Sequence, residues 1–530
     1  MFVDLRSVPD EASIESDLCI VGAGAAGIAI ARELLGHQVR VTLLESGGLE
    51  YEDTVQDLCA GESTGTHSVD LVESRLRYFG GSTNHWGGNC APFDAIDFES
   101  RSWIPHSGWP ITAATMAPYF RRALSYCEVE PPGADPADVE ALPEWLARLR
   151  LRLDGGELQE KVFLHSPPTR FGEVYRAALE RPGSNCTVYA HANAVELETN
   201  PDGTMVTAVR TRGLDGRSHR FVARRFVLAA GIENARLLLL SNGARPQGLG
   251  NEHDMVGRCF MAHAGLHAGR IMLRAPQETL HLYGLGAWRD KATGQDVPAA
   301  LGFQPRREFL ERHQIANCTV FLAEAIEGSS TPGFRALRRI GRKLKNGQRP
   351  RDLAADIATV LGDVDAIAYA TYLRLTEHTE HRIADLFYII EQVPDRHSRV
   401  MLAADSDRLG CRKLRVEWRL GEMEKRTLAA VQDLLAREAG RLGLGAVQVR
   451  DLDMDKPFPA ASSLSHFMGT TRMSADPRRG VVDADCRVHG VGNLYVAGGS
   501  VFPTAGANMP TANIVALALR LADHLRGRHV

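Results

Sequence analysis

A glycine-rich turn between two apolar strands near the N-terminus constrains the fold more than any other stretch. Residues 17–47 read DLCIVGAGAAGIAIARELLGHQVRVTLLESG. They combine an apolar strand at 18–21, a small-residue helix to residue 35 and a second strand that ends at Glu45. The turn has the G-x-G-x-x-G spacing of a dinucleotide-binding βαβ unit. The sequence therefore predicts an α/β fold with a Rossmann-like domain.

Each part of this unit suits a dinucleotide. Gly22 permits the tight turn, Gly24 lets the backbone approach a pyrophosphate, and Gly27 lets the helix pack closely against the strand. The helix N-terminus supplies amides and partial positive charge to the phosphates, and Glu45 suits the ribose hydroxyls. The cofactor residues predicted from this unit are Gly22, Gly24, Ala25, Ala26, Gly27, Glu45 and Ser46.

A second glycine-rich stretch, YFGGSTNHWGGNCAPFD at 78–94, favours FAD over NAD. Its glycines bring the backbone close to a flat ligand, whose ring edge the backbone N–H groups can bond. A predicted hairpin around Asp202-Gly203 and a turn at 229–231 offer further contacts to the dinucleotide. These stretches add Gly80, Gly81, Ser82, Asn84, His85, Trp86, Gly87, Gly88, Ala194, Val195, Ala230 and Gly231 to the predicted cofactor site.

Composition narrows the class of protein. A chain of 530 residues exceeds the size of one core, and a net charge of −4 gives no pull toward nucleic acid. Nine cysteines without CxxC spacing argue against a disulfide framework and a metal site, and fit reduced thiols in a cytosol. No signal peptide and no transmembrane segment are visible, so we expect a cytoplasmic protein. The oligomeric state is not indicated.

The motifs GAGAAG with Glu45, GGSTNHWGG, VLAAGIENARLLLLS (227–241), HFMGTTRM and ANMPT resemble the glucose–methanol–choline (GMC) oxidoreductases. The resemblance covers roughly 1–260 and 385–530 and is strongest for the bacterial, sugar-acting branch that includes pyranose oxidases. It implies an FAD-dependent oxidoreductase acting on CH–OH donors. In pyranose oxidases, the histidine of a similar G-G-x-S-T-H-W stretch carries FAD covalently, and His85 falls at that position. The alternative is a hydrogen-bonding or packing histidine beside noncovalent FAD.

The resemblance also implies a domain order. We expect an FAD-binding first part at 1–110, a helical excursion at 111–165 and a second FAD-binding part at 166–260. A substrate-binding domain at 261–450 follows, in which strand-like runs at 260–330 and 386–420 form an antiparallel sheet over the substrate. Residues 451–530 complete the FAD-binding and catalytic part. A basic amphipathic helix at 334–353 belongs to an insertion at about 330–380. We interpret it as a solvated helix packed on its own domain rather than a membrane or partner surface.

The C-terminal motifs carry the chemistry that the resemblance implies. An alcohol oxidase needs a base within hydrogen-bond reach of the hydroxyl, and histidine suits neutral pH. His466 of HFMGTTRM matches the family's base, which takes that proton while a hydride moves to flavin N5. The family's second residue, His or Asn, usually precedes the proline, where this chain has Met509. We therefore expect Asn508, one residue earlier, as the partner rather than Asn513. Gly498, Gly499, Asn508, Met509 and Thr511 complete the predicted cofactor contacts.

The sequence thus predicts FAD-dependent oxidation of an alcohol group, on a sugar or glycoside by resemblance, to a carbonyl. The electron acceptor is open between oxygen, a quinone and a protein. Three alternatives differ in chemistry: an oxidoreductase for aryl or aliphatic alcohols, a lyase that keeps FAD redox-silent, and a non-enzymatic flavin-binding subunit. A Ser-His-Asp hydrolase is disfavoured, because no G-x-S-x-G elbow follows a strand.

Overall fold

The N-terminal βαβ unit is present as predicted. The unit consists of β3 (Leu18–Val21), α1 (Ala25–Glu33) and β4 (Val41–Leu44). The computed structural model describes residues 1–131, 133, 135–153, 155–273, 277–286, 294, 296–324, 331–345, 352–368, 371 and 383–527. The two strands pair in parallel, Leu18 opposite Val41. Only the end of the helix differs, because α1 stops two residues before residue 35.

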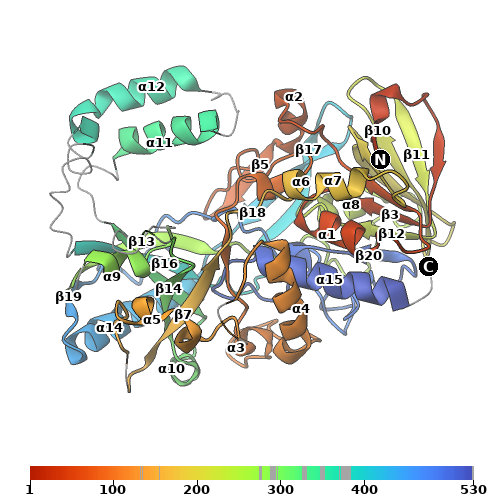
Figure 1. Cartoon of the computed structure of the whole chain (residues 1–530). Helices are drawn as coiled ribbons and strands as arrows, with labels where there is room; N and C mark the ends of the chain where they lie inside the picture. Colours follow the sequence, from red (N-terminus) through yellow and green to blue (C-terminus); the bar gives the residue numbers. More distant parts are fainter. Residues whose placement is uncertain are drawn as a thin grey trace.

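A six-stranded parallel sheet extends this unit in the order β1-β8-β4-β3-β12-β20. Strands β3 and β4 are entirely buried, as expected of parallel strands covered on both faces. Helix α15 (Thr511–Gly527) packs against α1 and α4 (Ala113–Tyr126) beside this sheet (Figure 1). The added strands are β1 (Phe2–Asp4), β8 (Cys186–Ala190), β12 (Arg225–Leu228) and β20 (Leu494–Val496).

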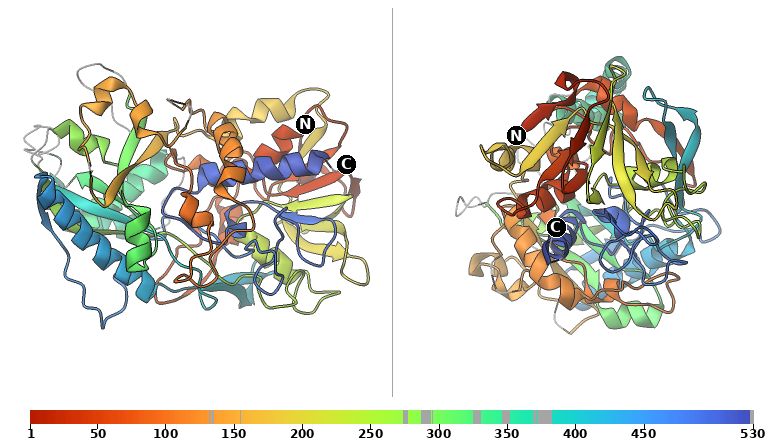
Figure 2. Two further views of the ribbon diagram at one scale, coloured as in Figure 1. Left: turned by 90° about the horizontal axis from the view of Figure 1, so that it is seen from below. Right: turned by 90° about the vertical axis from the view of Figure 1, so that its right-hand side faces the viewer.

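A seven-stranded antiparallel sheet forms the opposite half of the molecule (Figures 1 and 2). Its order is β19-β13-β16-β15-β14-β7-β6, and α14 (Glu422–Arg441) packs against it. This confirms the predicted architecture of a Rossmann-like part and an antiparallel sheet. The strands are β6 (Asn89–Cys90), β7 (Leu158–His165), β13 (Ala264–Leu273), β14 (Ala299–Pro305), β15 (Cys318–Glu324), β16 (Ile383–Ile390) and β19 (Gly445–Gln448).

Two segments differ from expectation. Residues 158–165 were expected within a helical excursion, but they form β7, because the apolar run VFL pairs with β14. The run at 412–418 was expected in the antiparallel sheet over the substrate. It forms β18 (Arg412–Trp418) in a separate three-stranded sheet with β17 (Arg399–Ser406) and β5 (Gly61–Gly65), since β5 offers a parallel edge.

The predicted hairpin around Asp202-Gly203 is confirmed by the antiparallel pair β9 (Ala194–Thr199) and β10 (Val206–Arg212). Strands β11 (Ser218–Val222) and β2 (Ser13–Glu15) complete its four-stranded sheet. The remaining helices described are α2 (Asp53–Gln56), α3 (Ala95–Phe98), α5 (Glu144–Ala147), α6 (Phe171–Val174), α7 (Arg176–Glu180), α8 (Glu233–Leu240), α9 (Gln277–Leu282) and α10 (Arg307–His313).

The basic segment forms part of a helical hairpin of α11 (Pro332–Lys345) and α12 (Leu353–Gly362), which pack on each other. Of the predicted helix at 334–353, residues 346–351 lie outside the described residues. Lys343 forms an ion pair with Glu73, which connects the hairpin to the N-terminal part of the chain. Among the described helices, none combines the length and apolar character that a membrane crossing requires.

Candidate functional site

A cavity of about 1160 Å³ lies at the carboxyl ends of the central parallel strands. Val21 and Leu44, the last residues of β3 and β4, line it, together with Ala229, which follows β12. Ligands of open α/β sheets bind at this edge. The cavity continues from there past residues 81–89 to residues 462–467 and 509–511. It therefore joins the glycine-rich turn to the C-terminal motifs.

The three glycines of the turn differ in what surrounds them. A Cβ on Gly22, which has φ 105°, would lie 2.8 Å from the carbonyl oxygen of Ala229. On Gly27 a Cβ would lie 1.9 Å from the carbonyl oxygen of Gly22, so Gly27 is required for helix–strand packing. A Cβ on Gly24 would meet nothing within 4 Å, and Gly24 lines the cavity. The turn therefore leaves room for a ligand at Gly24.

Three buried polar atoms on the cavity wall have no hydrogen-bond partner. They are Nη1 of Arg77, Oδ1 of Asn89 and Oδ1 of Asn193. Buried polar groups are nearly always paired in folded proteins, so these atoms await a ligand. A cationic donor and two amide acceptors match the phosphates and the N–H and O–H groups of FAD. The residues present thus fit this cofactor. Sequence reasoning did not single out any of the three: Asn89 lies within the glycine-rich stretch 78–94, whereas Arg77 and Asn193 lie outside the recognised motifs.

Glu45 stabilises the glycine-rich turn directly. Its Oε2 accepts a hydrogen bond from the backbone amide of Ala23 at 3.1 Å, and its Oε1 accepts one from the amide of Gly47 at 3.1 Å. The carboxylate also lines the cavity. Glu45 therefore holds the turn in shape while it presents an acidic group at the end of β4, where the sequence predicts a ribose contact.

Most of the predicted cofactor residues lie on the cavity wall. Those that line it are Gly22, Gly24, Ala25, Ala26, Glu45, Ser46, Gly81, Ser82, His85, Trp86, Gly87, Gly88, Ala194, Val195, Ala230, Gly231, Gly498, Gly499, Met509 and Thr511. Gly27, Gly80, Asn84 and Asn508 do not line it. Asn84 instead donates to the carbonyl of Phe79 at 3.0 Å and closes the turn before it.

His466 reaches the cavity from a tightly turned segment. Leu464 and Ser465, directly before it, have φ of 50° and 59°, a left-handed conformation that is costly for side chains other than glycine. Farther along the motif, Gly469 has φ 86°, and a Cβ there would lie 2.2 Å from the carbonyl oxygen of Cys259. The backbone around His466 is thus fixed by its neighbours, which is typical of a functional site.

His466 is neutral at pH 7. Burial lowers its pKa well below the ordinary value of 6.5, and a charge on neighbouring His263 would lower it further. Its Nδ1 lies 2.9 Å from Nδ1 of His263, a residue with no exposed surface. Since His466 lines the cavity, its remaining edge is available there as a proton acceptor. Sequence reasoning missed His263, which lies in no motif that we recognised.

The two predicted asparagine partners do not lie at the cavity. Asn508 is fully buried, where its Nδ2 donates to the carbonyl of Pro92 at 2.8 Å and its Oδ1 accepts from Gln304 at 3.1 Å. Asn513, in the first turn of α15, donates to the carbonyl of Ala91 at 2.9 Å. Both amides fasten residues 91–93 to the C-terminal segment. The structure therefore does not bring Asn508 to His466. Met509 occupies the cavity wall instead.

An apolar platform borders the cavity near His466. Leu285, Phe387, Leu464 and Met509 line the cavity and pack on buried residues of the antiparallel sheet, among them Phe163 of β7 and Phe321 of β15. We call these four side chains the apolar platform. They give this end of the cavity a surface suited to the apolar face of a ligand.

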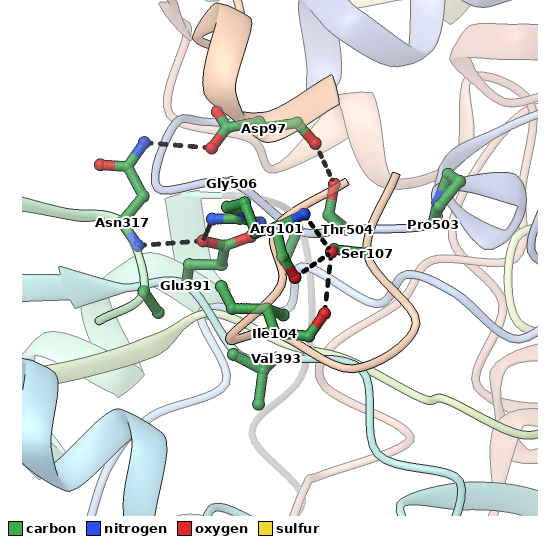
Figure 3. A network of polar contacts seen from close by, with 12 residues as sticks. Asp97, Arg101, Ile104, Ser107, Asn317, Glu391, Val393, Pro503, Thr504 and Gly506 are labelled. Carbon is green, nitrogen blue, oxygen red and sulfur yellow. Dashed lines mark hydrogen bonds and ion pairs between the residues drawn. The ribbon is translucent and has the colours of Figure 1, made fainter. Parts of the chain in front are cut away.

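A buried polar network supports the loop at residues 503–506 (Figure 3). Arg101 donates to both carboxylate oxygens of Glu391, at 2.6 and 2.7 Å, and neither side chain exceeds 2% exposure. Asp97 accepts a bond from Asn317 and, through its carbonyl, one from Thr504. Burial raises the pKa of Asp97 to about 8, assisted by the charges of Asp94 and Glu391.

Arg472 and Asp483, in the C-terminal segment, make hydrogen bonds with the backbone of other residues. Arg472 donates to the backbone carbonyl of His106 and does not line the cavity. Asp483 accepts bonds from the backbone amides of Asp485 and Arg487 in a turn. Within the described ranges, no group of three His, Cys, Asp or Glu side chains is arranged to hold a metal ion.

Comparison with known proteins identifies similar chains. Residues 394–518 match the family model described as GMC oxidoreductase. The paromamine 6'-oxidase of Streptomyces fradiae is 26% identical over 96% of this chain and 91% of its own. The fructose dehydrogenase large subunit of Gluconobacter japonicus is 26% identical over 67% of this chain and 56% of its own. The crystal structure of pyridoxine 4-oxidase from Mesorbium loti shares the fold, with a TM-score of 0.56, 18% identity and coverage of 97% and 100%.

Proposed function

We propose that this chain is a GMC oxidoreductase that holds FAD and oxidises an alcohol group of a sugar or glycoside to a carbonyl. The observation that carries the proposal is the single cavity that joins the glycine-rich turn to His466. A cofactor and a proton acceptor thereby share one site.

The chain's own residues would hold the cofactor and move the proton. Gly24 would leave space for the pyrophosphate, and Arg77 would add a cationic group to the wall of the same cavity. FAD held there would supply the acceptor for the hydride that leaves the alcohol carbon. His466 takes the hydroxyl proton, so the O–H bond breaks as an N–H bond forms on the imidazole. The N-terminus of α15, at Thr511, lies on the cavity wall and would add positive potential beside a bound flavin.

Two observations bear on the substrate. The names of two similar proteins, the paromamine 6'-oxidase and the fructose dehydrogenase large subunit, support a sugar-like substrate for this chain. The apolar platform beside His466 favours a substrate that also carries an apolar group. We therefore propose a glycoside with an apolar aglycone in preference to a free hexose. An aryl alcohol is the second candidate, because it would fill the same platform.

An anaerobic flavin-reduction screen tests this proposal. The holoenzyme is mixed with free sugars, alkyl and aryl glycosides, and benzylic alcohols, and bleaching of the flavin is followed. We expect glycosides to bleach it fastest. Fastest reduction by benzylic alcohols would support the second candidate. If the flavin stays yellow with every alcohol and the protein cleaves a cyanohydrin, the protein is a lyase and the proposed oxidation is wrong. Parallel turnover with oxygen and a quinone then identifies the acceptor.

The linkage of FAD is tested separately at His85, which lies on the cavity wall. A covalent bond at His85 would be established if the acid-precipitated wild-type protein stays yellow and the acid-precipitated His85→Ala variant is colourless. A colourless precipitate with yellow supernatant would establish noncovalent FAD. The proposed oxidation holds in either case, because the proton acceptor is a different residue.

A further inference from the structure

A second histidine, His263, lies directly behind His466 on the side away from the cavity. The two Nδ1 atoms are 2.9 Å apart, and the ring planes are perpendicular. On its other edge, Nε2 of His263 lies 3.1 Å from the carbonyl oxygen of Ala505 and 2.9 Å from that of Gly506. His263 is completely buried and does not line the cavity. It therefore has no contact with a substrate.

These contacts fix the positions of the hydrogens. Carbonyl oxygens only accept hydrogen bonds, so Nε2 of His263 must carry the hydrogen. Burial lowers the pKa of His263, so this imidazole is neutral and its Nδ1 is an acceptor. The hydrogen between the two Nδ1 atoms consequently belongs to His466. In neutral His466 this leaves Nε2 without a hydrogen.

We propose that His263 is a positioning residue that locks His466 in the tautomer protonated at Nδ1. In this form His466 presents a bare Nε2 to the hydroxyl of the substrate. The inference rests on the proposed function in one respect, namely that His466 is the proton acceptor. Without an acceptor at Nδ1, a neutral His466 can carry its hydrogen on Nε2 and cannot then take a second proton there.

The backbone holds the two histidines next to each other. Met261 and Met468 exchange two backbone hydrogen bonds, at 3.0 and 2.9 Å, and Gly265 exchanges two with Ser462. His263 thus lies between Met261 and Gly265, and His466 lies between Ser462 and Met468, so backbone hydrogen bonds hold each segment on both sides of its histidine. A Cβ on Gly265 would lie 2.7 Å from the side chain of Leu464, so a larger residue here would displace that side chain.

The two carbonyls are held just as firmly. Gly506 has φ 57°, and a Cβ there would lie 2.8 Å from Oδ2 of Asp97. Asp97 belongs to the buried network that also contains Arg101 and Glu391 (Figure 3). The loop therefore cannot turn its carbonyls away from His263 without breaking this network.

The arrangement also assists the proton transfer. When His466 takes the substrate proton on Nε2, its Nδ1–H still donates to His263, and His263 still donates to the two carbonyls. The new positive charge is thus hydrogen-bonded without any rearrangement of side chains. A hydrogen-bonding partner that orients a metal-ligating histidine typically contributes about 10- to 100-fold in metal affinity or activity. In a catalytic triad, a histidine held in the wrong tautomer lowers kcat by more than this.

Nitrogen NMR tests the tautomer directly. Protein labelled with ¹⁵N-histidine is compared with His466→Ala, whose missing signals assign His466. We expect a protonated Nδ1 and an unprotonated Nε2 at pH 7.5, and loss of this pattern in His263→Phe. A protonated Nε2 on His466 in the wild-type protein would overturn the inference. This readout needs no substrate, so it decides the tautomer even if no sugar is oxidised.

Rapid-mixing kinetics test the consequence, using any alcohol that bleaches the flavin. We expect His263→Phe to lower the flavin-reduction rate constant about 100-fold, with little change in substrate affinity or flavin content. His263→Asn, which places an oxygen near the position of Nδ1, should recover at least 10-fold of this loss. His313→Phe, an exchange of the same kind on α10, controls for the substitution. His263→Phe with an unchanged rate constant, or a loss explained wholly by missing flavin, would refute the positioning role.

Discussion

The glycines of the N-terminal turn separate packing from ligand binding at single positions. Gly27→Ala should destabilise the protein by about 1–3 kcal/mol or more, because its Cβ would overlap the carbonyl oxygen of Gly22. Gly24→Val should leave the unfolding free energy of the apoprotein nearly unchanged, since the space beyond it is open. It should instead lower the bound flavin severalfold. Urea unfolding and the flavin-to-protein absorbance ratio distinguish the two. If the two variants lost the same amount of flavin and had the same free energy of unfolding, this assignment would be contradicted.

The apolar platform makes a second prediction for single residues. Phe387→Ala removes the only aromatic ring of the four side chains. Loss of one apolar contact in a binding pocket costs about 1–3 kcal/mol. We therefore expect kcat/KM for an aryl glycoside to fall about 10- to 100-fold relative to that for the corresponding methyl glycoside. Met509→Leu, which keeps an apolar side chain of similar size, should preserve the ratio. Equal losses for both glycosides would show that the ring does not contact the aglycone.

At the scale of elements, the Arg101–Glu391 pair joins the segment after α3 to the end of β16. Both side chains are almost completely buried and bond each other twice. Removing one charge leaves the other buried without its partner, so Glu391→Gln should cost about 3–5 kcal/mol. The double variant Arg101→Met/Glu391→Met should lower the free energy of unfolding by less than Glu391→Gln does. Urea titrations of both variants test the order, and a milder single variant would contradict it.

At the scale of the whole molecule, opposing buried groups set the pH of greatest stability. Burial lowers the pKa of His165, His263 and His466, so the unfolded chain binds more protons below pH 6.5, and stability falls as the solution becomes more acidic. The raised pKa of Asp97, about 8, acts in the opposite direction. Its protonated form stabilises the fold fully below the unfolded pKa of 3.8, and this contribution is lost as pH rises toward 8.

We therefore expect the highest Tm between about pH 6 and 7, with a decline toward pH 8. Asp97→Asn should flatten that decline, because the amide does not titrate. Scanning calorimetry at intervals of half a pH unit measures both curves. A wild-type Tm that rises steadily from pH 6 to 8 would contradict the role given to Asp97.

The sequence predicts the fold better than the contacts at the site. The βαβ unit and the hairpin at 202–203 follow from local patterns of apolar residues and glycine, and both are confirmed. The direction of a side chain in an irregular loop follows from tertiary partners instead. Asn508 turns to Pro92 and Gln304, more than 200 residues away, and so leaves the cavity to Met509. His263 was not predicted for the same reason, since its partner lies 203 residues along the chain.

The rate of flavin reduction by alcohol as a function of pH, in the wild type and in His466→Asn, tests the role of His466 most directly. We expect a wild-type rate constant that is level from pH 6.5 to 8 and falls only at more acidic pH, because the pKa of His466 lies well below 6.5. The variant should be slower by about 10²–10⁴ at pH 7. A variant within tenfold of the wild type, with the same pH profile, would contradict His466 as the proton acceptor.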